Sequence, residues 1–453
     1  MTDRLPVHVT LSSRERGFLR VLGDARKNAL AIIPRICLRQ PIVSGKVLRR
    51  FHMVQDPQAL RHILRDAEAD YPKSPEVLSI LRPAIGRGLF TSQGEHWRWQ
   101  RRAAAPVFSR RNVETLGPVM TRAADAACAR LDAACSGTPA AEIDIADEMM
   151  STAFDVIADV CFSQGDGVPQ DMARHAIERY LAGAGRVSLF DFLGLPDWVP
   201  RPGRALMSGE LKRLKTATDA AIDRRKGAGP SQIPDLLDLL IASHDPDTDR
   251  TMTTQELRDN VLTFLVAGHE TTALTLAWSL YLCAFDPAVQ DRARAQAQSV
   301  LQGRTATPDD IPALTYIRQI IDEAMRLYPP AAFLSRTAMA DDTLCDRDVK
   351  RGDTIMLPIY ALHRHQMLWD NPDTFDPDRF KDPRAVANFT YLPFGTGPRV
   401  CIGMSFALQE AVIVLATLLS RFQFTAIPGR DPRPEMVLSL RPAGGVWLTV
   451  NRA

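Results

Sequence analysis

The segment from Thr253 to Phe285 constrains the fold of this chain more than any other. Thr253 and Glu256 have the Thr-x-x-Glu spacing of a capping box, which predicts that a helix begins there. The residues that follow are apolar on nearly every face of a helix, so we expect the helix to run through the centre of a large protein. Glu270 interrupts the run. A charged residue there would be costly in lipid, and this favours a buried helix over a membrane span.

Helical periodicity dominates the rest of the chain, and strand-like alternation is confined to short pieces. The predicted fold class is therefore mainly α with small accessory β-sheets. Without a repeat or a long polar linker, we expect one domain over 41–453, with 1–40 as an N-terminal extension packed on it. The predicted helices span 112–134, 142–163, 206–225, 254–285, 287–301 and 314–327, with another after Cys401, and the predicted strands span 47–54, 354–359, 436–440 and 445–450.

Charge and cysteine usage exclude several classes of protein. The net charge is +2 from 55 basic and 53 acidic residues, which gives no argument for nucleic-acid binding. Seven cysteines without a C-x-x-C pair indicate free thiols in a reducing compartment, as opposed to a disulfide framework or a zinc site. The N-terminal residues lack the apolar region of a signal peptide or anchor. We therefore expect a cytoplasmic protein without a membrane span.

The loop 394–403, FGTGPRVCIG, surrounds one cysteine with three glycines and a proline. Glycines allow the backbone to approach a ligand closely, and such a loop can aim several N–H groups at the sulfur of Cys401. An apolar, helix-like run follows, and the N-terminus of a helix adds positive potential. Both effects favour thiolate over thiol. The sequence therefore predicts a loop that holds a sulfur anion.

The middle of the long helix carries an unusual group of small and polar residues. Gly268 weakens a helix by about 1 kcal/mol relative to alanine. The hydroxyl of Thr271 can bond a carbonyl of the preceding turn. Together with Glu270 they predict a local opening of the helix with room for water or a small molecule. The alternative is a glutamate that is satisfied by a partner elsewhere in the fold.

Two further pairs have helical spacing. Glu323 and Arg326 lie three apart among apolar residues, which favours an interior ion pair over a solvated one, and Arg379 is available as a further partner. Trp97 and Arg101 lie four apart. An indole N–H and a guanidinium on one helix face form a carboxylate-binding surface, although basic helix faces are more often merely solvated.

Together, four patterns resemble the haem-thiolate monooxygenases, the cytochrome P450 family. They are F-x-x-G-x-R-x-C-x-G (394–403), A-G-x-E-T-T (267–272), E-x-x-R (323–326) and W-x-x-x-R (97–101). They occur in the order typical of that family, and the resemblance runs from about residue 40 to the C-terminus. It implies the cytochrome P450 fold, haem b (iron protoporphyrin IX) as cofactor, and insertion of one atom of O₂ into an apolar substrate.

The resemblance also implies roles for single residues. Cys401 is the expected axial ligand to the iron, Phe394 packs near the sulfur, and Gly403 belongs to the same cofactor-binding loop. Glu270 and Thr271 are the acid–alcohol pair that delivers protons to dioxygen at the haem. The residues expected to bind the haem propionates are Trp97, Arg101 and Arg399, together with His96 and Arg336. The residues expected to form a buried ion triad under the cysteine loop are Glu323, Arg326 and Arg379.

Within the family, GRGLFTSQGEHW, TFLVAGHETT and PFGTGPRVCIGMSFAL are most similar to bacterial fatty-acid hydroxylases and their eukaryotic membrane-bound relatives. By that likeness, the residues that face substrate are Phe90, Ala267, Ala331 and Ala332. The basic residues Lys46, Arg49 and Arg50 either catch a substrate carboxylate or form a solvated edge. The segment 188–204 is either a connector packed on the core or a mobile lid.

The chain ends at residue 453 without a flavin reductase domain. We therefore expect a soluble monomer that receives electrons from ferredoxin and ferredoxin reductase or a similar separate redox partner, docking on arginines such as Arg102, Arg110 and Arg111. One alternative is an H₂O₂-dependent peroxygenase of the same fold, but members of that kind lack the acid–alcohol pair. The other is a non-catalytic haem-binding or sensor protein.

Overall fold

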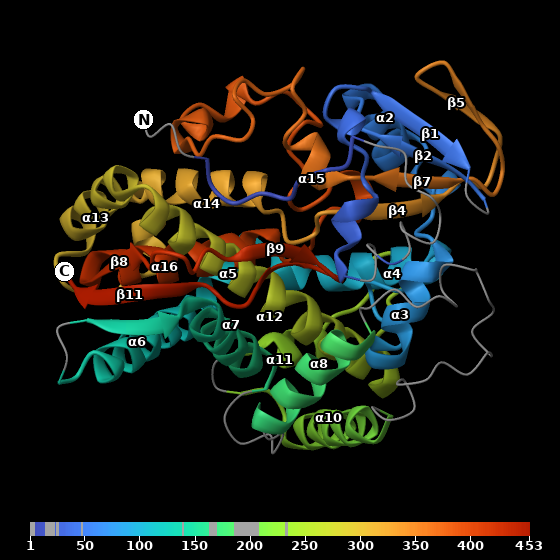
Figure 1. Cartoon of the computed structure of the whole chain (residues 1–453). Coiled ribbons are helices and arrows are strands. Elements are labelled where there is room, and N and C mark those ends of the chain that lie inside the picture. Colours follow the sequence, from blue (N-terminus) through green and yellow to red (C-terminus); the bar gives the residue numbers. More distant parts are fainter. Residues whose placement is uncertain are drawn as a thin grey trace.

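The structure is a computed structural model of the chain (Figure 1). The residues that it describes are 5–13, 23, 27–46, 49–137, 140–162, 170–184, 208–231 and 234–453. The predicted loop 188–204 lies outside the described residues. Helices make up most of the described chain, and the strands form small sheets, as predicted.

The long helix α12, Thr254–Phe285, runs through the centre of the molecule (Figure 1). The predicted capping box is present, because the Thr253 hydroxyl accepts the Glu256 N–H and the Glu256 carboxylate accepts the Thr253 N–H. Asp286 ends the helix and caps the next one, α13, Pro287–Leu301. Helices α7, Ile145–Cys161, and α16, Met404–Arg421, pack against α12. This packing explains why α12 is apolar on nearly every face.

The other predicted helices are also present, with shifted ends. The prediction 112–134 is two helices, since Gly117 and Pro118 start a new one. The first residues of the prediction 142–163 belong to a strand, β3, Ala141–Asp144, before α7 begins. The remaining α-helices are α2 Pro57–Arg61, α3 Pro75–Ile85, α4 Gly94–Ala104, α5 Arg110–Thr115, α6 Gly117–Ala134, α8 Gln170–Ala184, α10 Ser208–Ala228, α11 Leu236–Ile241, α14 Thr315–Leu327 and α15 Ile359–Leu362.

Within the described residues, the strands form four small sheets. A four-stranded sheet has the order β1-β2-β7-β4, and it lies to the right in Figure 1. A three-stranded sheet has the order β3-β11-β8, and the pairs β9–β10 and β5–β6 stand alone. The strand bounds are β1 Ile42–Lys46, β2 Arg50–Val54, β4 Leu334–Thr337, β5 Asp342–Leu344, β6 Arg347–Val349, β7 Thr354–Leu357, β8 Phe422–Ala426, β9 Arg433–Met436, β10 Leu440–Ala443 and β11 Trp447–Arg452.

One predicted strand is wrong. Residues 436–440 are mostly the turn of a hairpin, with β9 ending at Met436 and β10 beginning at Leu440. The apolar side chains of Val437 and Leu438 face the cavity described below, so their hydrophobicity reflects a ligand site and not a strand. The predicted strand 47–54 begins only at Arg50 within the described residues.

The N-terminal residues 5–13 pack against the helical core. The Val7 N–H donates to the Tyr281 hydroxyl at 3.1 Å, and the Val9 N–H donates to the Tyr360 hydroxyl at 2.9 Å. Among the described helices, α16 alone is long and apolar enough to cross a membrane by itself, and α12 with α13 passes the same test as a pair bent by 115°. In α16, 72% of the apolar window is buried inside the protein, as in a core helix.

Candidate active site

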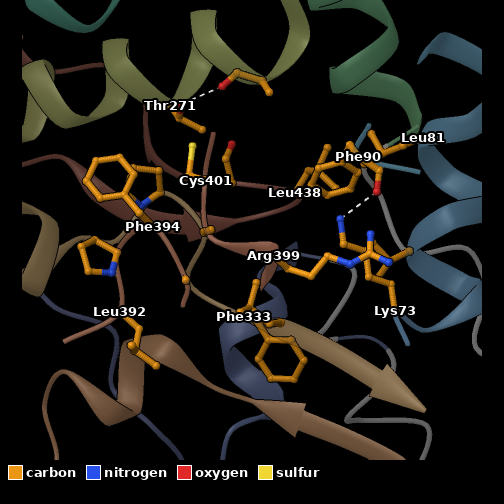
Figure 2. A pocket seen from close by; sticks show the side chains of 18 of the residues that line it. Lys73, Leu81, Phe90, Thr271, Phe333, Leu392, Phe394, Arg399, Cys401 and Leu438 are labelled. Atoms are coloured by element: carbon orange, nitrogen blue, oxygen red, sulfur yellow. Dashed lines mark hydrogen bonds between the residues drawn. The ribbon is translucent and has the colours of Figure 1, made fainter. Parts of the chain in front are cut away.

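A cavity of about 750 Å³ lies between α12 and the cysteine loop. Figure 2 shows Thr271 of α12 on one side of it and Cys401 on the other, with Phe90 and Leu438 along the wall. Most of the lining is apolar. The sequence motifs at 97–101, 267–272 and 394–403 all contribute residues to this single cavity, although they are far apart in the chain.

The cysteine loop is held in a conformation that needs its glycines. Gly395 and Gly397 have φ angles of 67° and 70°, which side-chain-bearing residues rarely adopt. A Cβ at Gly397 would also collide with the Leu64 carbonyl oxygen. The Cys401 N–H donates to the Phe394 carbonyl at 2.9 Å, which closes the loop just before α16 begins. The predicted combination of a glycine-rich loop and a following helix is therefore present.

The side chain of Cys401 is exposed, and it opens onto the cavity. Burial raises the pKa of this thiol, and the Gly403 N–H and the Arg101 guanidinium lower that pKa by less. The donors thus act in the predicted direction, toward thiolate, while desolvation opposes them. A metal ion on the sulfur reverses this balance, since coordination deprotonates a thiol outright.

Four cationic side chains line one side of the cavity, namely Lys73, Arg101, Arg336 and Arg399. Burial lowers the pKa of each of them, and that of Arg336 falls to about 10. The Glu68 carboxylate accepts from Arg399 Nε at 2.8 Å. Four cations around one paired carboxylate leave excess positive charge in a partly dry site. Such a site favours a ligand that carries two negative charges.

Trp97 belongs to the same wall, and His96 does not. The Arg399 guanidinium carbon lies 3.7 Å from the centroid of the Trp97 ring, so the two side chains form one surface. His96 does not line the cavity. Its ring packs edge-on against Trp99 and accepts the indole N–H at 3.3 Å. The expectation that His96 reaches a haem propionate is therefore wrong, because the helix directs that side chain away from the cavity.

This donor set fits a haem. Cys401 supplies one sulfur ligand for iron, and the four cations supply counter-charge for two propionates. The propionate contacts expected for Trp97, Arg101, Arg336 and Arg399 are compatible with their places in the wall. Lys73 and Glu68 were missed, because a single lysine in YPKSP or a glutamate in DAEAD resembles any solvated residue in the sequence.

Across the cavity, Glu270 and Thr271 both contribute to the lining, and Glu270 has the partner elsewhere in the fold that the alternative predicted. The Glu270 carboxylate, 6% exposed, forms an ion pair with Arg441 of β10. The Thr271 hydroxyl donates to the Ala267 carbonyl at 2.7 Å (Figure 2). Helix α12 continues unbroken through Gly268. The predicted local opening of the helix is therefore wrong, since the hydroxyl adds a bond to the ladder without displacing one.

The predicted substrate residues are largely confirmed as cavity residues. Phe90, Ala267 and Ala331 line the cavity, but Ala332 is fully buried in the core, where its carbonyl accepts the Tyr360 N–H at 3.0 Å. The placement of Ala332 was therefore wrong. Further apolar lining that sequence reasoning missed comes from the four-stranded sheet, from the residue just before β4 and from the β9–β10 hairpin. These residues are Phe51, Met53 and Met356 of the sheet, Phe333, and Leu438 of the hairpin.

The three basic residues near β2 differ in their contacts. Lys46 is exposed at the end of β1 and does not line the cavity. Arg50 is occupied, because it donates to Asp353 at 2.6 Å and to the Asp348 carbonyl at 2.8 Å. Arg49 lines the cavity and lies 3.6 Å from the Glu76 carboxylate. Arg50 is therefore part of the sheet structure and not an anchor for a substrate carboxylate.

The expected ion triad is assembled. Arg326 Nε and Nη2 donate to the two carboxylate oxygens of Glu323 at 2.6 and 2.8 Å, and both residues are fully buried. Arg379 Nε lies 3.4 Å from Glu323 Oε1. Arg326 also donates to three carbonyl oxygens of the segment 363–374, which leads toward the cysteine loop. The triad therefore connects α14 to that segment.

Arg102 differs from its predicted role. Its Nε and Nη2 donate to the two oxygens of Asp245 at 2.7 and 2.8 Å, and the Asp245 side chain is fully buried. This contact holds the pKa of the Asp245 carboxyl well below its usual value. Arg102 therefore neutralises a structural carboxylate, and its charge is not free to attract a partner. Arg110 and Arg111 remain exposed.

Comparison with known proteins agrees with this geometry. The family model for "Cytochrome P450" matches residues 41–449. The chain is 33% identical to "Putative cytochrome P450 132" of Mycobacterium tuberculosis, over 89% of this chain and 88% of that protein. It is 34% identical to the "Cyclooctatin synthase" of Streptomyces melanosporofaciens, over 85% of this chain and 83% of that protein. It is 32% identical to a "Cytokinin hydroxylase" of Arabidopsis thaliana, over 81% of this chain and 72% of that protein.

A solved structure has the same fold. The crystal structure of the "cytochrome P450DA heme domain" superposes with a TM-score of 0.81 at 27% identity, over 91% of this chain and 90% of that one. The shared fold, the family match and the cavity that contains the Cys401 thiol lead to one conclusion. The chain belongs to the cytochrome P450 family and is a haem-dependent monooxygenase.

Proposed function

We propose that this enzyme hydroxylates an apolar organic molecule, using haem b held by Cys401. One observation carries the proposal. A single, mostly apolar cavity has a cysteine thiol on one side, an acid–alcohol pair on the opposite side, and four buried or half-buried cations along its wall. When bound, the haem supplies the iron at which O₂ is activated. The protein supplies a sulfur ligand, charge compensation and protons.

The chain's own residues can manage those protons. Thr271 already uses its hydroxyl hydrogen toward Ala267, so its oxygen can accept a hydrogen bond from a water in the cavity. Glu270 is held by Arg441, which fixes its carboxylate at the edge of the cavity. A carboxylate held at that edge can accept a proton from the solvent side and pass it to a water that hydrogen-bonds to Thr271. Because the site is otherwise apolar, few competing proton routes exist.

The lining favours an apolar substrate. Aromatic and aliphatic side chains from α3, α12, β7 and the β9–β10 hairpin surround the space near Thr271. The four cations lie on the wall that the haem propionates would cover, and the other polar side chains of the lining are mostly threonine and serine hydroxyls. A sugar or a nucleotide would leave its polar groups without partners. Two of the relatives are named for unlike molecules, cyclooctatin and cytokinin, so a fatty acid is one substrate among several that this cavity could take.

We propose that electrons come from a separate acidic protein such as a ferredoxin. The exposed Arg65 lines a surface hollow together with Pro398 of the cysteine loop, and the exposed Arg111 adds further charge. Arg98 lines the same hollow, where it forms an exposed ion pair with Glu95. A partner docked there would approach the sulfur side of the haem. Reduction by a ferredoxin should slow as salt rises, because charges are screened within about 10 Å at 0.1 M. A rate unchanged by ionic strength would contradict this docking surface. A monomer in the cytoplasm is part of the same proposal, supported by seven free cysteines.

The haem-loaded protein tests the proposal directly. Apolar compounds that displace water from the iron should change its spin state, and a hydroxylated product should form with ferredoxin, ferredoxin reductase, NAD(P)H and O₂. Product formation with H₂O₂ alone, but not with the redox partners, would instead indicate a peroxygenase. Haem binding without turnover under either condition would indicate a sensor.

A further inference from the structure

We propose that Asp259 and Asn260 are positioning residues that fix the place of Phe90, and through it the part of a substrate that lies over the reactive centre. The inference rests on the proposed function, because it takes Phe90 as a wall of the substrate site. Both residues are buried, at 2% and 0% exposed, and neither lines the cavity. They act at a distance, through the backbone of the segment 86–92 that precedes α4.

The segment 86–92 is docked on α12 by alternate backbone amides. The Arg87 N–H donates to Asp259 Oδ2 at 2.8 Å, and the Leu89 N–H donates to Asn260 Oδ1 at 2.9 Å. Gly88 lies between these contacts. A Cβ at Gly88 would collide with the Asp259 carbonyl and with Thr263 Oγ1. The backbone of this segment therefore lies directly against the helix, and the two side chains set its register along α12.

The orientation of the Asn260 amide is determined by its surroundings. Its Nδ2 donates to Gln100 Oε1 at 2.8 Å and to the Glu256 carbonyl at 2.9 Å. Its Oδ1 must therefore face the Leu89 N–H. A buried amide with all of its partners in place makes a rigid contact, because any displacement would leave polar groups unpaired.

The other flank of Phe90 is held as well. Lys73 Nζ donates to the Phe90 carbonyl at 2.7 Å (Figure 2), and it lies 3.5 Å from the centroid of the Phe90 ring. Beyond Phe90, the Ser92 hydroxyl donates to the Arg87 carbonyl at 2.6 Å. With the backbone fixed on both sides, the Phe90 ring can move only about its own side-chain torsions. Its position in the cavity thus follows from the docking on α12.

A shift of this docking should change how the cavity discriminates between ligands. The probes are imidazole, which needs little space beside the iron, and 4-phenylimidazole, whose ring must pass Phe90. Both change the Soret band on binding, so their dissociation constants can be measured without substrate or redox partner. The ratio of the two constants reports the position of the wall.

The variant Asn260→Leu keeps the number of side-chain heavy atoms and the branch at Cγ. It removes the bond to Leu89 and also the two bonds that fix the amide. We expect it to change the ratio of dissociation constants about tenfold, as for a displaced aromatic contact. In a Phe90→Ala background the same substitution should change the ratio less than about twofold, because coupled residues are not additive. An unchanged ratio, or an equal effect with and without the Phe90 ring, would overturn the inference.

Matched controls separate positioning from loss of stability. Gln290→Leu removes a buried amide that also makes several hydrogen bonds, between α13 and β8, away from the cavity, and it should leave the ratio unchanged. If Asn260→Leu does not fold, Gly88→Ala is the variant that tests the inference. It displaces the segment 86–92 without removing a hydrogen-bonding group, so it should also change the ratio of dissociation constants. Gly209→Ala, where a Cβ meets nothing within 4 Å, is its control. A protein whose Soret band does not respond to imidazole would instead refute the proposed function.

Discussion

The buried pair of Glu323 and Arg326 allows a quantitative test of how burial alters an ion pair. The substitution Glu323→Gln keeps the size and shape of the side chain. Its new amide N–H group would point at one of the two guanidinium nitrogens that now lie 2.6 and 2.8 Å from the carboxylate. Arg326 would keep its three carbonyl acceptors but would lose its closest counter-charge.

The expected loss of stability is large, because both side chains are fully buried. Removing one partner of a buried pair typically costs about 3–5 kcal/mol, since the remaining charge cannot return to water. Arg379 would add to this loss, because its guanidinium lies 3.4 Å from the same carboxylate and would remain near Arg326 without it. We therefore expect the apparent free energy of unfolding to fall by about 3–5 kcal/mol.

The assay is urea unfolding of the haem-loaded protein, followed by tryptophan fluorescence and by the Soret band. Glu114→Gln is the matched control, because Glu114 pairs with Arg110 at a similar distance of 2.8 Å on another helix, with side chains 48% and 89% exposed. Exposed pairs of this spacing contribute about 0.5 kcal/mol or less. If the two variants lost the same stability, burial would not be what gives the Glu323 pair its importance.

Three other predictions concern the site and its helix. Cys401→Ser should abolish the red-shifted Soret band of the reduced, CO-bound protein, and Cys345→Ser should keep it; the reverse result would reassign the iron ligand. Thr271→Ala should leave haem content and ligand binding unchanged while H₂O₂ replaces much of the product per NAD(P)H consumed, and full coupling would remove this hydroxyl from the mechanism. Burial lowers the pKa of His269 from 6.5 to about 4, so the unfolded chain binds more protons between these values and stability falls as pH drops through that window. His269→Leu should therefore flatten the pH dependence of the urea midpoint from pH 6.5 to 4, and an unchanged slope would show that this histidine is not buried as described.

The long helix, the cysteine loop and the ion pair of α14 could be predicted because each is encoded by neighbouring residues. A capping box requires two residues three apart, and Thr253 and Glu256 meet this condition in the sequence itself. The glycines around Cys401 are needed for positive φ angles, which is also a local property. Local patterns of this kind led to the family and to most of its expected site residues.

Other features could not be predicted, because they join residues from distant elements. Lys73 approaches Phe90, and Arg441 pairs with Glu270, only after the sheets and helices have packed. Neither cation differs in the sequence from a solvated one. The same reason explains two of the errors, since the direction of His96 and the burial of Ala332 depend on the packing around them.

The sequence by itself determined which chemistry this protein can perform, because a sulfur ligand, an acid–alcohol pair and helix-spaced charges are encoded in short motifs. The tertiary structure alone decided the state of those groups. Burial raises the pKa of Cys401, and the donors around the sulfur lower it by less. Arg102 is paired with the buried carboxylate of Asp245, and Asn260 hydrogen-bonds to the backbone of the segment that contains Phe90. The physical reason is that desolvation and hydrogen-bond partnership depend on the whole environment of a group, which the fold assembles from residues far apart in the chain.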